Sequence, residues 1–273
     1  VTVALSGDGG DELFGGYNRY KYFKHVSAVS LLPSFLKKIS NNIIQNIETS
    51  KLDKLLSNFT NTDSPGIKLQ KASKAFLSSS TLDYYISTIQ HGISSKYLID
   101  KSNLDRPDIQ KYYSLLSSFT EEEKLMFLDC YEYMPSDILV KVDRASMASS
   151  LECRAPFLDP SLASFALSLP LQQKISAGNS KVILKKILSE YLPKDYFERP
   201  KMGFGFPLDE WLRSDLKEWA EDILFTQSNA IINPFIEASY VKSIWTKHLN
   251  GQNRFSQVWT IIMLKSWLKE RNF

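Results

Sequence analysis

The sequence contains few cysteines and no long apolar run. Cys130 and Cys153 are the only cysteines among 273 residues, and neither belongs to a CxxC or Cys/His set. We therefore expect reduced thiols packed in a core, not a disulfide or a zinc site. The best candidate for a membrane span, VWTIIMLKSWL near the C-terminus, is shorter than the roughly 18 residues needed and contains Lys265. No membrane partner is expected.

An excess of charge of one sign is also missing. The 33 basic and 30 acidic residues leave a formal charge of +3, and the lysines are scattered along the chain. This pattern argues against a nucleic-acid partner. With no recognisable signal peptide and reduced thiols, we expect a cytoplasmic protein. Because Val1 already lies in a strand-like run, we also expect the chain to be part of a longer protein.

Apolar spacing predicts a mostly helical chain that begins with one strand. Residues 1–5 are typical of a buried strand and 11–22 of the helix that follows it. A single strand cannot form a sheet, so we expect further strands to come from outside this chain. More helices are predicted in 35–59 (two), 67–78, 121–134 (with a Thr120 and Glu123 cap), 135–147 (starting at Pro135), 180–191, 208–223, 237–249 and 255–270.

The stretch LSGDGGDELFGGY has the parts of a phosphate site. Gly7, Gly9 and Gly10 allow a close approach of the backbone, and a helix start supplies unpaired N–H groups. It is neither a Walker loop nor a dinucleotide fingerprint, because GxxxxGK[ST] is absent and Glu12 replaces the third glycine. The spacing of Asp8 and Asp11 also excludes an EF-hand.

Three carboxylates in this loop, those of Asp8, Asp11 and Glu12, oppose a bound phosphate. At about 4 Å and an effective dielectric constant of about 20, each like-charge contact costs roughly 4 kcal/mol. Mg²⁺ binds carboxylate and phosphate oxygens together and would turn this repulsion into a bridge. The loop therefore favours a metal–nucleotide site. The alternative is that Asp8 and Asp11 only cap a helix and a turn.

A second group of charges lies in SDILVKVDRASMASSLECRAPFLD. Asp137, Lys141 and Arg144 share one face of the predicted helix, and Glu152 and Arg154 alternate with apolar residues in an extended run. These charges could hold the opening loop or contact a substrate. Surface ion pairs are the alternative.

A third stretch, ERPKMGFGFPLDEWL, carries Lys201 in a loop rich in glycine and proline. A lysine that closes over a nucleotide would oppose charge developing on a phosphate. A contact that stabilises the transition state by about 4 kcal/mol corresponds to a nearly thousandfold increase in rate. Taken alone, the segment also fits a solvated surface lysine.

Together the three stretches resemble the synthetase domain of the glutamine-dependent asparagine synthetases, a family that includes β-lactam synthetases and sugar-modifying amidotransferases. The resemblance covers the start of the chain and about residues 121–213. It implies an α/β parent fold of the adenine nucleotide alpha-hydrolase-like kind, a parallel sheet flanked by helices. Residues 1–273 would be the C-terminal part of such a domain, truncated at its N-terminus, predominantly α-helical with one N-terminal strand.

The resemblance also implies a two-step reaction. ATP adenylates a carboxylate and pyrophosphate leaves; ammonia from a glutaminase domain, in the same chain or a separate one, then forms the amide. By motif, Ser6, Gly7 and Gly9 would bind the nucleotide and Asp11 would bind Mg²⁺. The catalytic residues would be Asp8 and Lys201. The acceptor site would include Asp137, Arg144 and Arg154, and a homodimer is compatible with the sequence.

Two departures from the family pattern leave alternatives open. Asp8 replaces the glutamate common in asparagine-making relatives, and a shorter side chain changes catalytic reach, so the acceptor could be aspartate or a sugar acid. The pyrophosphate loop SGGxDS and the glutaminase cysteine are absent, and we expect them to precede Val1. The alternative is a catalytically incompetent fragment that serves as a structural module. An acid/base hydrolase using Asp8 and Asp11 would leave Lys201 and Arg154 without a role.

Overall fold

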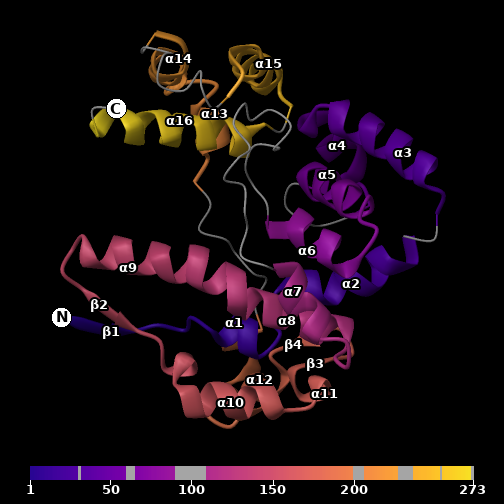
Figure 1. Ribbon diagram of the computed structural model, residues 1–273, viewed down its shortest axis with the longest axis vertical. Helices are drawn as coiled ribbons and strands as arrows, with labels where there is room; N and C mark the ends of the chain where they lie inside the picture. Colours follow the sequence, from indigo (N-terminus) through magenta and orange to yellow (C-terminus); the bar gives the residue numbers. More distant parts are fainter. Residues whose placement is uncertain are drawn as a thin grey trace. The chain divides into compact units, whose positions relative to one another are not determined.

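The chain forms mainly helices, as the spacing of its apolar residues predicts (Figure 1). The structure is a computed structural model that describes residues 1–29, 32–59, 65–89, 109–198, 206–226, 236–252 and 254–271. These residues divide into two units: unit 1 is Val1–Val29, Ser79–Ile89 and Arg106–Met202, and unit 2 is Ser30–Ser78, Gln90–Asp105 and Gly203–Phe273. No helix among the described residues has both the length and the apolar character to cross a membrane.

Unit 1 contains two small sheets within a set of helices. Its strands are β1 (Val3–Leu5), β2 (Glu152–Arg154), β3 (Ile175–Ser176) and β4 (Asn179–Ser180). Its helices are α1 (Gly10–Leu13), α2 (Asn18–Val29), α6 (Thr81–Ile89), α7 (Ile109–Leu115), α8 (Glu121–Leu128), the π-helix η2 (Asp129–Ile138), α9 (Leu139–Met147), η3 (Pro156–Leu158), α10 (Pro160–Ser168), α11 (Leu171–Lys174), α12 (Val182–Leu188) and η4 (Lys194–Tyr196).

The first strand has its partner inside this chain, so the expectation of a single strand is wrong. β1 and β2 are parallel, with Val3 opposite Glu152 and Leu5 opposite Arg154, and α9 runs beside them in Figure 1. The prediction of a buried strand over residues 1–5 is wrong as well. β1 is shorter, and its Leu5 is 75% exposed because this sheet has two strands.

The predicted helix over residues 11–22 is interrupted between α1 and α2. Gly15 lies there with a φ of +69°, and a Cβ at this position would meet Ile175 Cγ1 at 2.4 Å. Backbone of this kind suits glycine and ends a right-handed helix. The break turns Asn18 and the residues after it into the start of a new helix, α2.

The predicted helix start at Pro135 is also wrong. Pro135 lies inside the π-helix η2, which follows α8 directly, and the N–H of Leu139 donates to the carbonyl of Met134. Proline has no N–H to donate, and a π-type turn accommodates the missing bond by shifting the hydrogen-bond register. The predicted capping box before α8 is confirmed: Thr120 and Glu123 bond reciprocally.

The regular elements among the described residues of unit 2 are helices. They are α3 (Ser34–Asn46), α4 (Thr49–Leu56), α5 (Pro65–Ala75), α13 (Leu208–Trp211), α14 (Lys217–Glu221), the π-helix η5 (Asp222–Thr226), α15 (Ala238–Leu249) and α16 (Phe255–Glu270). The helix predicted over 208–223 is divided into three short pieces, whereas α16 matches its prediction at both ends. Val258, Ile261 and Ile262 of α16 are fully buried in an apolar cluster with α15 and η5.

Candidate functional site

The loop after β1 begins beside the end of β2. The N–H of Ser6 donates to the carbonyl of Arg154 at 2.8 Å, and the Ser6 hydroxyl donates to Asp8 Oδ2 at 2.8 Å. Because the strands are parallel, their carboxyl ends meet at one edge, where α/β proteins bind ligands. The structure therefore brings together three predicted site residues, Ser6, Asp8 and Arg154.

The glycines of the loop differ in their surroundings. Gly9 precedes α1 with a φ of +86°, and a Cβ there would come within 2.4 Å of Leu158 Cδ2. A Cβ on Gly16 would meet Asp11 Oδ1 at 1.9 Å. Gly7 has nothing within 4 Å of its Cβ position and is exposed. The loop is thus packed tightly at Gly9 and open at Gly7, where a ligand has room to approach the backbone.

The three carboxylates of the loop have separate environments. Glu12 is buried and accepts a 2.7 Å hydrogen bond from the Tyr17 hydroxyl. Asp8 and Asp11 are half-buried, with the Asp11 side chain 32% exposed. No side chain caps α1, which removes the helix-capping alternative for Asp8. Glu12 therefore supports the fold, while Asp8 and Asp11 remain accessible to a ligand.

Lys181 is a residue of this site that the sequence did not reveal. Its Nζ lies 3.2 Å from Asp11 Oδ1, and its N–H donates to the carbonyl of Phe14. Its backbone is in the left-handed region, with a φ of +54°, immediately before α12. The AGN sequence before it indicates the β3–β4 turn but nothing about a partner at Asp11. Lys181 gives the acidic loop a positive charge.

The site suits a metal ion that arrives with a phosphate. Among the described residues, no group of three or more His, Cys, Asp or Glu side chains could hold a metal ion alone. Mg²⁺ commonly uses one or two carboxylates and completes its shell with water and substrate phosphates. Accessible Asp8 follows the open backbone of Gly7, and accessible Asp11 comes three residues later; two such carboxylates fit that kind of shared site.

The residues predicted for the acceptor site lie on neighbouring elements. Asp137 ends η2, Arg144 is on α9, and α9 contacts β2, which carries Arg154. All three are exposed. Arg154 Nε lies 2.7 Å from Glu152 Oε1, an exposed ion pair of the kind that the surface-pair alternative expects. Lys201, the predicted catalytic lysine, lies outside the described residues.

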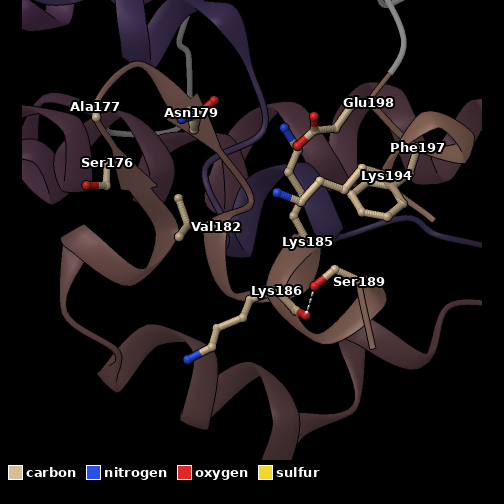
Figure 2. A pocket seen from close by; sticks show the side chains of 10 residues that line it. All are labelled: Ser176, Ala177, Asn179, Val182, Lys185, Lys186, Ser189, Lys194, Phe197 and Glu198. Atoms are coloured by element: carbon tan, nitrogen blue, oxygen red, sulfur yellow. Dashed lines mark hydrogen bonds between the residues drawn. The ribbon is translucent and has the colours of Figure 1, made fainter. Parts of the chain in front are cut away.

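A cavity of about 400 Å³ lies elsewhere in unit 1, between the β3–β4 turn, α12 and η4. Its lining contains Lys185, Lys186 and Lys194 and none of the predicted site residues. Figure 2 shows the amino group of Lys186 directed away from those of the other two lysines. The three ammonium groups do not point toward one position, so this cavity has no preformed anion-binding site.

The two cysteines are free, as predicted. Burial, together with nearby Glu12 and Asp129, raises the pKa of Cys130 to about 12. A thiol with so high a pKa stays protonated at neutral pH and is a poor nucleophile. Cys130 therefore belongs to the packing around α1 and has no place in the chemistry of the loop.

Comparisons with known proteins bear on the family of this chain. The family model described as asparagine synthase matches residues 1–269. The chain is 29% identical over 271 residues to asparagine synthetase [glutamine-hydrolyzing] 1 of Bacillus subtilis, covering 98% of this chain and 40% of that protein. It is 37% identical over 147 residues to asparagine synthetase [glutamine-hydrolyzing] of Rattus norvegicus, covering 48% of this chain and 25% of that protein.

The chain spans about two fifths of the length of the Bacillus relative. No solved structure matched it. The family model nevertheless covers nearly every residue, including the glycine loop, the charges around α9 and the position of Lys201. The chain therefore belongs to the asparagine synthase family.

Proposed function

We propose that the intact protein is an ATP-dependent ligase that converts a carboxylate into an amide. In the first step the carboxylate attacks the α-phosphorus of ATP and pyrophosphate leaves; in the second, ammonia displaces AMP. The observation that carries this proposal is the meeting of Asp11 and Lys181 beside an open glycine loop, at the carboxyl end of parallel strands. A carboxylate and an ammonium group together suit a magnesium-bound polyphosphate.

Each residue of the loop has a part in this proposal. The backbones of Gly7 and Gly9 and the Ser6 side chain bind the nucleotide. Asp11 holds Mg²⁺, which when bound neutralises the negative charge of the phosphates. Lys181 adds a second positive charge at the same place.

The remaining roles concern the reacting groups. Lys201 stabilises the negative charge that develops at the phosphorus. Asp8 assists formation of the adenylate and takes up a proton from the incoming amine. Asp137, Arg144 and Arg154 bind the acceptor. A glutaminase domain supplies ammonia. The acceptor is aspartate or a related acid. Sugar acids stay in this class because Asp8 reaches less far than the glutamate common in asparagine-making relatives. The competing proposal is a structural module without activity.

Exchange of labelled pyrophosphate into ATP by the intact protein distinguishes these proposals. Aspartate and uronic-acid sugars are compared as acceptors, with Mg²⁺ present or chelated. A ligase exchanges label with one acceptor class and only with Mg²⁺. No exchange with any carboxylate, from a folded intact protein, would favour the structural module.

The Asp11→Asn substitution tests the residue that carries the proposal. It keeps the shape of the side chain and removes its charge, so we expect exchange to fall about 100-fold at low Mg²⁺. Glu190→Gln, at an exposed position after α12, is the matched control and should retain full exchange. Equal rates for both variants would remove Asp11 from the metal site.

A further inference from the structure

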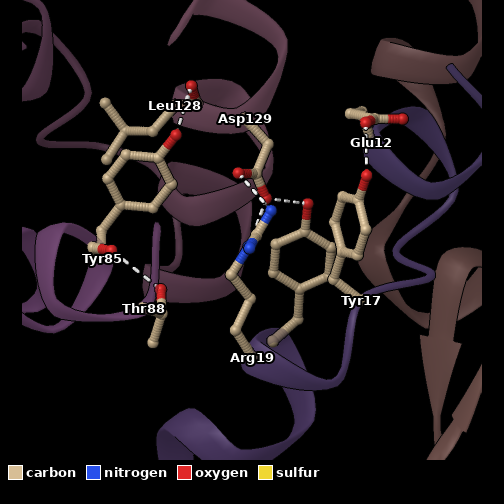
Figure 3. Close-up of polar contacts among 8 residues, drawn as sticks. Glu12, Tyr17, Arg19, Tyr85, Thr88, Leu128 and Asp129 are labelled. Atoms are coloured by element: carbon tan, nitrogen blue, oxygen red, sulfur yellow. Dashed lines mark hydrogen bonds and ion pairs between the residues drawn. The ribbon is translucent and has the colours of Figure 1, made fainter. Parts of the chain in front are cut away.

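A largely buried arginine, with 12% of its side chain exposed, lies near the acidic loop and η2. Arg19, in the first turn of α2, donates from Nε to Asp129 Oδ2 at 2.8 Å and from Nη2 to Asp129 Oδ1 at 2.6 Å. Asp129 is completely buried and also accepts from the Tyr20 hydroxyl. Figure 3 shows the guanidinium facing the carboxylate, with tyrosine rings beside it. The paired charges fix Arg19 to the start of η2.

Two tyrosines pack on the same guanidinium and reach to different parts of unit 1. The Arg19 Cζ atom lies 4.2 Å from the centre of the Tyr17 ring and 4.8 Å from that of Tyr133. The Tyr17 hydroxyl donates to Glu12 in α1. Tyr133 lies in η2 four residues before Asp137, and burial together with the nearby Asp137 carboxylate raises the pKa of Tyr133. One buried cation therefore supports contacts to both elements.

Both elements need such support. α1 has four residues and no side-chain cap, and so short a helix has little stability of its own. The π-helix η2 contains Pro135, and Asp137 is exposed near its end. Side-chain contacts must therefore determine where Asp11, next to Glu12, and Asp137 lie. A fully paired polar network is rigid enough to do this.

We propose that Tyr17, Arg19 and Tyr133 form a positioning bridge. In it, Tyr17 holds the magnesium side of the site through Glu12, Tyr133 holds the part of η2 that carries Asp137 on the acceptor side, and Arg19 supports both tyrosines. The proposal rests on the proposed function and adds three residues that touch neither substrate. It predicts that removing the Tyr17 hydroxyl and removing the Tyr133 hydroxyl affect the binding of different substrates.

Three tyrosine-to-phenylalanine variants of the intact protein provide the kinetic test. Tyr133→Phe removes the polar contact toward Asp137 and should raise KM for the acceptor about five- to tenfold, a ratio that corresponds to about 1–1.4 kcal/mol, and leave KM for ATP unchanged. Tyr17→Phe should raise KM for ATP at limiting Mg²⁺ by a similar factor and leave the acceptor KM unchanged. Tyr20→Phe, the matched control on the same carboxylate, should lower thermal stability without changing either KM.

Hydrogen–deuterium exchange tests the bridge without relying on activity. Arg19→Lys cannot retain both the paired hydrogen bonds and the planar stacking. It should increase exchange in residues 10–16 and in 134–138, whereas Tyr17→Phe should affect the first segment and Tyr133→Phe the second.

The two measurements separate the failure of the bridge from the failure of the proposed function. A wild-type protein without pyrophosphate exchange would overturn the proposed function, and the hydrogen-exchange pattern would still decide the bridge. An active protein whose Tyr17→Phe and Tyr133→Phe variants change both KM values equally would overturn the bridge alone. Unchanged hydrogen–deuterium exchange in both segments of the Arg19→Lys protein would also overturn the bridge.

Discussion

The Arg19–Asp129 pair of unit 1 and the buried bases Lys265 and His248 of unit 2 respond to burial in different ways. In unit 1, burial lowers the pKa of Arg19, but the Asp129 carboxylate outweighs this and raises it above its ordinary value. Arg19 therefore stays charged beside its partner. In unit 2, burial lowers the pKa of Lys265, whose Nζ donates to the carbonyl of Leu224. Burial and nearby Arg213 lower the pKa of His248 to about 4.

Arg19 thus keeps its positive charge beside Asp129, whereas the pKa values of Lys265 and His248 shift in the direction that favours their neutral forms. The apolar cluster around them is built mainly from side chains of α15, α16 and η5, which need only fit one another. A buried ion pair contributes little net stability, because desolvation offsets its attraction. Its occurrence next to the acidic loop is understandable if the pair fixes the position of α1 and η2.

The largest expected effect is on stability in unit 1. Asp129→Asn keeps the shape of the side chain but leaves the Arg19 charge buried without a counterion. We expect a loss of about 3–5 kcal/mol in the free energy of unfolding, measured by urea titration. Glu132→Gln, on the same π-helix, should change it by less than about 0.5 kcal/mol. Equal midpoints for the two variants would mean that the pair does not hold this unit.

A smaller effect is expected from an equally conservative change in unit 2. Ile261→Val removes one methyl group from a fully buried side chain and should cost about 1 kcal/mol in the same titration. Met263→Leu on the partly exposed side of α16 should cost less. If Ile261→Val cost as much as Asp129→Asn, the contrast between a charged and an apolar interior would be wrong.

The pH dependence should have opposite signs in the two units. Burial raises the pKa of Asp129 to about 6, so between about pH 4 and 6 the folded state binds more protons and unit 1 loses stability as pH rises. The lowered pKa of His248 means that the unfolded state binds more protons between about pH 4 and 6.5. Unit 2 therefore gains stability as pH rises through that range.

Hydrogen exchange at pH 4.5 and 6.5, corrected for the intrinsic rates, measures this difference for each unit. Slopes of the same sign in both units would contradict it. Asp129→Asn should abolish the slope of unit 1 and leave that of unit 2 in place.

Local signals in the sequence were enough for many of the helices. The capping box at Thr120 and Glu123 and the apolar spacing of α16 depend on neighbouring residues only. The errors occur where distant residues decide the backbone. Ile175 lies against Gly15 and separates α1 from α2, and β1 pairs with a strand far along the chain. The sequence around Pro135 predicts a helix start because a π-helical register has no sequence signal of its own.

The same distinction between local and distant partners applies to the site. The motif predicted Ser6, Asp8 and Arg154, and the parallel pairing of β1 and β2 brings them to one edge. The sequence does not predict Lys181 as a site residue, because its partner Asp11 lies far away in sequence and approaches it only in the folded chain. The roles of Asp11 in magnesium binding and of Lys201 in catalysis stay predictions.

The magnesium dependence of ATP binding tests the central claim most directly. Isothermal titration of the intact protein with ATP is compared in excess Mg²⁺ and in excess EDTA, for the wild type and Asp11→Asn. If Asp11 joins the phosphates through a divalent ion, the wild type binds ATP much more tightly with Mg²⁺, and Asp11→Asn loses most of that difference. Identical affinities with and without Mg²⁺ would contradict the account.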